Sequence, residues 1–157
     1  MTVVDAPLAG QVLALADVPD PVFAGLIVGA GLALEPEDGA TEVLVISPVA
    51  GRVMKVHPHA FVLLDESGAG VLVHLGIDTV RLEGAGFTVH VADGDEVARG
   101  ARMITFDPTA VRRAGYSAVC PVVVMQSKAD DVEPAVAVGS PAVVGEPLFT
   151  WSPAVAA

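Results

Sequence analysis

Four histidines, at positions 57, 59, 74 and 90, are the side chains of this sequence best suited to proton or group transfer near neutral pH. His74 stands inside the apolar run "VLVHLGIDTV", where a buried imidazole needs partners for both ring nitrogens. On apolar periodicity alone, a hydrogen-bonded core histidine is the default interpretation of His74. His90 adjoins the acidic loop "ADGDE" and is expected to be a solvated surface residue.

Whether His74 meets a second histidine depends on the hairpin predicted by "AFVLLDESGAGVLVHL". Asp65 can close its tip opposite either Gly68 or Gly70. Either pairing places His59 and His74 on one face of the sheet, directly opposite each other or on the diagonal. A loop one residue longer or shorter would place them on opposite faces. The sequence therefore permits a His59–His74 pair without requiring it.

Two kinds of site follow from such a pair, and spacing alone does not separate them. In the first, one imidazole accepts a phosphoryl group while a backbone carbonyl fixes its tautomer, and the second imidazole donates a hydrogen bond to the phosphate oxygens. Gly76 would then allow a close approach of the backbone. In the second, His57, His59 and His74 supply three nitrogens to a zinc ion with an open fourth position.

Length, charge and cysteine content narrow the class of protein. The 157 residues suit one domain, and a hydrophobic content of 53% argues against a disordered chain. A net charge of −11 argues against nucleic acid and anionic lipid as partners and favours partners that present Arg or Lys. The single cysteine, Cys120, cannot form an internal disulfide and is interpreted as a small buried hydrophobe.

The longest apolar stretch, residues 22–34, is too short to cross a bilayer, and the N-terminus lacks the basic start of a signal peptide. We therefore expect a cytoplasmic protein without direct membrane insertion.

Short runs rich in Val, Ile and Leu, separated by glycine and proline, predict an all-β fold. The predicted strands are "GQVLALA", "EVLVIS", "GRVMKV", "AFVLLDE", "GVLVHL", "RMITF", "CPVVVMQ" and "PLFTW". This pattern favours an antiparallel sandwich over a parallel α/β sheet. Two short helical connectors are expected. One lies in "DPTAVRRAG", with Asp107 as N-cap and Gly115 as the stop, and the other in "DVPDPVF".

The chain also contains a weak internal repeat. "APLAGQVLAL" (6–15) and "SPVAGRVMKV" (47–56) share the pattern Pro, two residues, Gly, one residue, Val. A later pair, residues 94–106 and 139–151, shares two glycines, a valine and a hydrophobic ending. We therefore expect hairpin-like units that occur twice in the fold.

The ordered segments "APLAG", "DVPDPVFAGLIVGAGLAL", "SPVAGRV", "PHAF", "VHLGIDTV", "LEGAGF", "GDEVARG" and "CPVV" resemble the glucose-family IIA phosphocarriers of the bacterial phosphotransferase system. The resemblance runs from about Ala6 to Trp151, and it implies a single IIA domain over residues 1–157. The histidine followed closely by Gly-Ile-Asp-Thr-Val, with His-Ala-Phe upstream, is a specific motif.

The resemblance implies a role for each matched residue. His74 matches the histidine that receives the phosphoryl group from the histidine-containing phosphocarrier protein and passes it to a cysteine of a IIB domain of a membrane sugar permease. His59 matches the helper that hydrogen-bonds the phosphate, and Asp78 an acidic residue at the rim. The apolar docking face is expected to include Phe23, Val28, Phe61, Leu72 and Leu75. No metal or other cofactor is required, because this transfer is catalysed mainly by positioning.

The same resemblance leaves some properties open. We expect a monomer that serves a glucose- or N-acetylglucosamine-type IIB domain. The alternatives are a regulatory binding protein, controlled by its phosphorylation, and the zinc site described above. Two departures from the family pattern stand out. His57 occupies a position where relatives often have a small hydroxyl residue, and Leu72 and Leu75 stand where relatives often have Phe.

Overall fold

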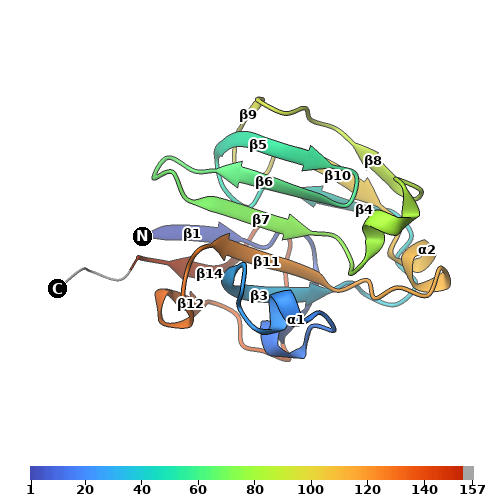
Figure 1. Cartoon of the computed structure of the whole chain (residues 1–157), viewed down its shortest axis with the longest axis horizontal. Coiled ribbons are helices and arrows are strands. Elements are labelled where there is room, and N and C mark those ends of the chain that lie inside the picture. Colours follow the sequence, from blue (N-terminus) through green and yellow to red (C-terminus); the bar gives the residue numbers. More distant parts are fainter. Residues whose placement is uncertain (154–157) are drawn as a thin grey trace.

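A computed structural model describes residues 1–153, and every strand pairing in this part of the chain is antiparallel. The predicted all-β class is confirmed (Figure 1). No helix among these residues is both long enough and apolar enough to span a bilayer. The strands form one large sheet and two small ones.

The large sheet positions the histidines. In spatial order its strands are β13 (Pro141–Ala142), β2 (Gly10–Ala14), β3 (Gly29–Glu35), β11 (Cys120–Met125), β7 (Gly70–His74), β6 (Ala60–Leu64), β5 (Gly51–His57) and β9 (Glu96–Val97). His74 is therefore the last residue of a strand in the interior of the sheet. His59 directly precedes the neighbouring strand β6.

The two small sheets have three strands each. The first contains β1 (Thr2–Asp5), β14 (Pro147–Trp151) and β12 (Val132–Pro134), and the second contains β4 (Val43–Ile46), β10 (Arg102–Phe106) and β8 (Phe87–Val89). Buried side chains of all three sheets, including Val4, Ile104 and Phe61, belong to one hydrophobic cluster. The core is therefore shared by the large sheet and both small sheets, as a β-sandwich requires.

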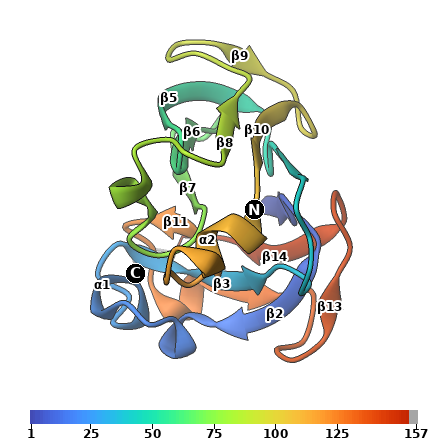
Figure 2. The same ribbon diagram turned by 90° about the vertical axis from the view of Figure 1, so that its right-hand side faces the viewer.

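Two short α-helices connect strands, as predicted. The helix α1 (Pro21–Ala24) begins at Asp20, whose side chain accepts a hydrogen bond from the Val22 N–H. The helix α2 (Pro108–Arg113) begins at Asp107 in the same way. Proline at the first helical position suits both starts, because its missing N–H would have no intrahelical partner there. Figure 2 looks onto the end of the molecule where α2 lies. Three 3₁₀ turns, η1 (Leu15–Asp17), η2 (Thr79–Leu82) and η3 (Ala129–Asp131), complete the described elements.

The predicted repeat is confirmed as an approximate two-fold symmetry of the backbone. In the large sheet, the strands β13-β2-β3-β11 correspond in order to β9-β5-β6-β7. The small sheet β1-β14-β12 corresponds in the same way to β4-β10-β8. Equivalent hydrogen bonds recur in the two halves. The Asp5 N–H donates to the Pro48 carbonyl at 3.0 Å, and the Ile46 N–H donates to the Pro7 carbonyl at 2.9 Å. The central strands β7 and β11 pair across the pseudo-axis.

A second, smaller hydrophobic cluster lies outside the main core. It contains residues from η1 and α1, such as Leu15 and Phe23, together with Ala33 and Val123 of the large sheet. The segment between β2 and β3 therefore covers the outer face of β3 and β11 (Figure 1). Cys120 is fully buried in the main core, in agreement with its predicted structural role.

Candidate functional site

His74 is held in one tautomer by the backbone that follows it. Its Nδ1 lies 2.6 Å from the Gly76 carbonyl oxygen. Since a carbonyl oxygen only accepts hydrogen bonds, Nδ1 carries the proton and Nε2 keeps a free lone pair. Gly76 has a φ of +77°, and a Cβ there would lie 2.6 Å from Thr79 Cγ2. Glycine is therefore needed to turn this carbonyl toward the ring.

His59 reaches His74 by a different route from the one expected from the hairpin. Asp65 lies opposite Ala69, and Ala60 is the residue paired with His74, so a continued ladder would place His59 on the opposite face. Of the two registers that the sequence left open, the structure has the one that places the two positions on opposite faces. His59 lies in the turn before β6, where its carbonyl oxygen still accepts a hydrogen bond from the Leu75 N–H at 2.7 Å, and its ring nevertheless contacts the His74 ring.

Three imidazole rings follow one another across this face of the sheet. The ring centroids of His59 and His74 are 5.1 Å apart, with an interplanar angle of 73°. On its other side, the His59 ring stacks on His57, with the centroids 5.7 Å apart and the planes at 23°. The fourth histidine, His90, is exposed and contacts Thr105, as expected for a surface residue. The site therefore contains a pair of histidines with a third in contact.

The two inner imidazoles are held neutral. Burial lowers the pKa of His59 to about 4, and the neighbouring rings of His74 and His57 act in the same direction. Burial also lowers the pKa of His74, although the Gly76 carbonyl and the carboxylates of Asp20 and Asp78 oppose this shift. A neutral imidazole with a free Nε2 is a nucleophile, whereas an imidazolium is not. Both rings are therefore in the form that group transfer requires at neutral pH.

The surroundings of His74 combine an aromatic wall with exposed apolar side chains. Phe23 of α1 contacts the His74 ring edge-on at a centroid distance of 5.3 Å. Nearby on α1 and η2, Val22 and Val80 are exposed, and Ile27 is 75% exposed. Sequence analysis predicted Phe23 as part of the docking face but did not identify Val22, Ile27 or Val80, and it did not single out Asp20. The capping pattern at Asp20 was the available signal, because it places a carboxylate at the start of α1.

The expected docking residues divide into two groups. Phe61 and Leu75 are 1% and 0% exposed and belong to the main core, so their assignment to a docking surface was wrong. The reason is the alternation of a strand, since Leu75 points to the face opposite His74. Val28 and Leu72 are partly buried against the smaller cluster, which also contains Phe23. Asp78 is exposed near His74.

The arrangement of the side chains does not support the zinc alternative. Within residues 1–153, no group of three or more His, Cys, Asp or Glu side chains is placed to hold a metal ion. His57 and His59 stack instead of converging on one point.

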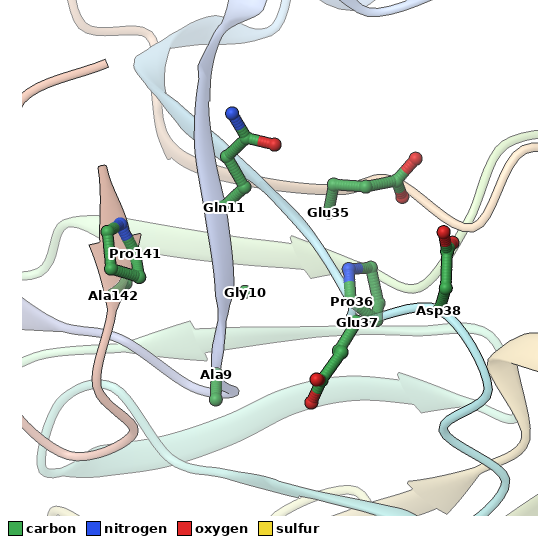
Figure 3. Close-up of a pocket in the computed structure, with 9 residues that line it drawn as sticks. All are labelled: Ala9, Gly10, Gln11, Glu35, Pro36, Glu37, Asp38, Pro141 and Ala142. Atoms are coloured by element: carbon green, nitrogen blue, oxygen red, sulfur yellow. The ribbon is translucent and has the colours of Figure 1, made fainter. Parts of the chain in front are cut away.

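A pocket of about 560 Å³ lies elsewhere, lined by residues of β2, β3 and β13. Figure 3 shows two of its carboxylates, Glu35 and Glu37, pointing in different directions. No histidine lines this pocket. Its acidic residues are partly held by Arg112, whose Nη2 lies 3.5 Å from Glu35 Oε2. The pocket is therefore separate from the histidine site.

Comparison with proteins of known structure supports the fold. The solved structure "glucose permease IIA from Mycoplasma capricolum" aligns with a TM-score of 0.72 and 33% identity, over 78% of this chain and 79% of that one. The all-β domain therefore has the fold of a glucose-permease IIA domain.

Residues 2–130 match the sequence model described as phosphoenolpyruvate-dependent sugar phosphotransferase system, EIIA 1. The chain belongs to this family and is an EIIA component, a phosphotransfer protein.

The sequence relatives differ in their domain content. The glucose-specific EIIA component of Oceanobacillus iheyensis is 42% identical over 129 residues, which cover 81% of this chain and 74% of that protein. The β-glucoside-specific EIIBCA component of Bacillus subtilis is 38% identical, over 87% of this chain and 22% of the relative. The glucose-specific EIICBA component of Streptococcus pneumoniae is 51% identical, over 68% of this chain and 14% of the relative. The chain thus spans only a small part of the two multidomain relatives.

Proposed function

We propose that His74 Nε2 accepts a phosphoryl group from the histidine-containing phosphocarrier protein and passes it to the cysteine of a IIB domain. The observation that carries this proposal is the hydrogen bond from His74 Nδ1 to the Gly76 carbonyl oxygen, which leaves Nε2 as the nucleophile. The N–P bond of the donor breaks as the bond to Nε2 forms, and the donor imidazole keeps the electron pair. The proton stays on Nδ1 throughout, hydrogen-bonded to the Gly76 carbonyl oxygen.

His59 is the helper in this proposal. Its neutral ring, 5.1 Å from the His74 ring, can donate one N–H to an equatorial phosphoryl oxygen. An imidazolium at this position would bind the dianionic product more tightly and retard its onward transfer. The low pKa of His59 therefore suits a carrier that must both take up and release the group.

The rim of the site suits transient partners. The exposed apolar side chains of Val22, Ile27 and Val80 can exclude water when a partner docks. Asp20 and Asp78 add negative charge near His74 and would attract arginines on a donor or acceptor. A glucose-type IIB domain is the proposed acceptor, in keeping with the two glucose-specific relatives. The chain is proposed to act as a monomeric cytoplasmic IIA domain.

The first prediction concerns the phosphorylated residue. Incubation with phosphoenolpyruvate, enzyme I and the histidine phosphocarrier should add one acid-labile phosphoryl group, measured by intact mass. His74→Gln should abolish this addition, because it removes the nucleophile. His59→Gln should still accept the group but transfer it to a IIB cysteine at least about tenfold more slowly, since the flexible Gln amide does not hold its N–H in the position of the imidazole donor. Retention of the label in His74→Gln would overturn the assignment.

A further inference from the structure

The orientation of the His59 ring has no hydrogen-bonded support in the described part of the chain. His74 is anchored by the Gly76 carbonyl, but no group within residues 1–153 donates a hydrogen bond to the His59 ring or accepts one from it. Among the described aromatic side chains, its ring contacts are the stack on His57 and the edge contact with His74. A donor that must point at a phosphoryl oxygen needs a fixed ring plane. The stack on His57 is the contact on the side away from His74.

The sheet register explains how His57 comes to lie there. His57 ends β5 and pairs with Ala60 of β6, and Ala60 pairs in turn with His74 of β7. His57 and His74 are thus two strands apart on one face, a separation of about 10 Å. Ala60, whose side chain is a single methyl group, separates them in this register. The His59 ring contacts both other imidazoles, His57 at a centroid distance of 5.7 Å and His74 at 5.1 Å.

The charged groups around His57 are few and fixed in place. The Asp93 carboxylate accepts a hydrogen bond from the Val56 N–H at 2.8 Å and one from Lys55 Nζ at 3.2 Å. These bonds lower the pKa of Asp93, and the nearby His57 contributes in the same direction. His57 is therefore stacked on His59 and has the anchored Asp93 carboxylate and its partner Lys55 as neighbouring titratable groups.

We propose that His57 is a positioning residue for phosphoryl transfer: its ring holds the plane of the His59 imidazole, so that His59 presents its N–H to the phosphoryl group on His74. This inference rests on the proposed function. It explains why an exposed strand-end residue two strands away from His74 is an imidazole. A flat ring is required for the stack, and a small side chain at position 57 leaves the His59 ring without support.

Transfer kinetics test the proposal. His57→Ala removes the stacked ring, His57→Phe keeps a flat ring without the imidazole nitrogens, and His90→Ala is the matched control at an exposed histidine outside the site. Single-turnover transfer from each phosphorylated protein to a IIB domain should slow about tenfold in His57→Ala, and by less than about threefold in His57→Phe. His90→Ala should transfer at the wild-type rate. Equal rates for His57→Ala and the wild type would overturn the proposal.

A measurement on the unphosphorylated protein separates this inference from the proposed function. Side-chain ¹⁵N chemical shifts report the tautomer and the pKa of His59 without any transfer partner. In His57→Ala the pKa of His59 should rise from about 4, because the ring loses cover and a neighbouring imidazole, and its shifts should approach those of a freely rotating imidazole. Unchanged His59 signals in a folded His57→Ala protein would refute the positioning role. Failure of the wild type to become phosphorylated would refute the proposed function alone.

Discussion

At the scale of single residues, the site depends on keeping histidines uncharged. His59 and His74 lie where solvent is partly excluded, and burial is the largest cause of the lowered pKa of each ring. The carboxylates near His74 oppose this effect without reversing it. The protein therefore holds two neutral imidazoles beside acidic groups, as the proposed transfer between arginine-bearing partners would require.

The lowered pKa values predict how stability changes with pH. The folded-state pKa of His59, about 4, lies below the ordinary value of 6.5, so the unfolded chain binds more protons as pH falls. The contribution of a neutral His59 to the free energy of unfolding is complete above pH 6.5 and is lost progressively as the pH falls toward 4. Between pH 7 and pH 5, the free energy of unfolding of the wild type should fall by about 1 kcal/mol more than that of His59→Gln, because solvent at the half-exposed ring screens part of the effect.

Urea unfolding at pH 7, 6 and 5 measures this difference. His90→Gln serves as the control, since His90 is exposed and lies outside the site. Parallel pH profiles for the wild type and His59→Gln would show that His59 is not held neutral by the fold.

The sequence could predict the properties of a residue that depend on its neighbours along the chain, such as the backbone partner of His74. Gly76, two residues after His74, predicted a close approach of the backbone, and the Gly76 carbonyl oxygen lies 2.6 Å from His74 Nδ1. Exposure was less readable. Leu72 and Leu75 both look like surface positions beside an active histidine, but three residues along a strand change the face, and Leu75 is fully buried.

At the scale of elements, strands with turn signals at both ends were predictable and the register between them was not. β10 and β14 have the predicted limits, Arg102–Phe106 and Pro147–Trp151. β3 (Gly29–Glu35) was not predicted as a strand, because its two glycines and the apolar residues before it hide the start. A one-residue change in a hairpin tip alters every facing pair, and the tip sequence "DESGAG" allows several loops.

The turn after β7 is the element on which the tautomer of His74 depends. Gly76 has a φ of +77°, and a Cβ there would lie 2.6 Å from Thr79 Cγ2 and 2.9 Å from the Ser117 carbonyl oxygen. Gly76→Ala should destabilise the protein by about 3 kcal/mol and slow phosphoryl acceptance, because the turn must move to relieve the contacts. Equilibrium unfolding and the rate of phosphoryl uptake measure the two effects.

Gly68→Ala is the matched control for this substitution. Gly68 has a φ of +85°, but nothing lies within 4 Å of a Cβ built there. It should cost only about 1 kcal/mol, the conformational strain alone, and should leave phosphoryl uptake unchanged. Equal losses of stability in the two variants would mean that the close contacts at Gly76 add nothing to the cost of the substitution.

At the scale of the whole molecule, a difference between the two symmetry-related halves explains why the site occurs only once in the described part of the chain. Val73 of β7 and Val122 of β11 pair across the pseudo-axis, which makes Val123 the counterpart of His74. The connection between β2 and β3 contains η1 and α1 and covers Val123, whereas only Pro58 and His59 connect β5 and β6. One half of the sheet is therefore covered and the other remains open to partners, with α1 forming the wall between them.

The net charge of −11 acts on association over the whole surface. If the partners present arginines, raising the salt concentration from 0.1 M to 1 M shortens the screening length from about 10 Å to about 3 Å and should slow bimolecular phosphoryl transfer about tenfold. Stopped-flow measurement of the second-order rate constant tests this. The first-order transfer step at saturating partner is the internal control and should change little, because the reacting groups are then in contact and screened from solvent ions. A second-order rate constant independent of salt would show that apolar docking alone governs the encounter.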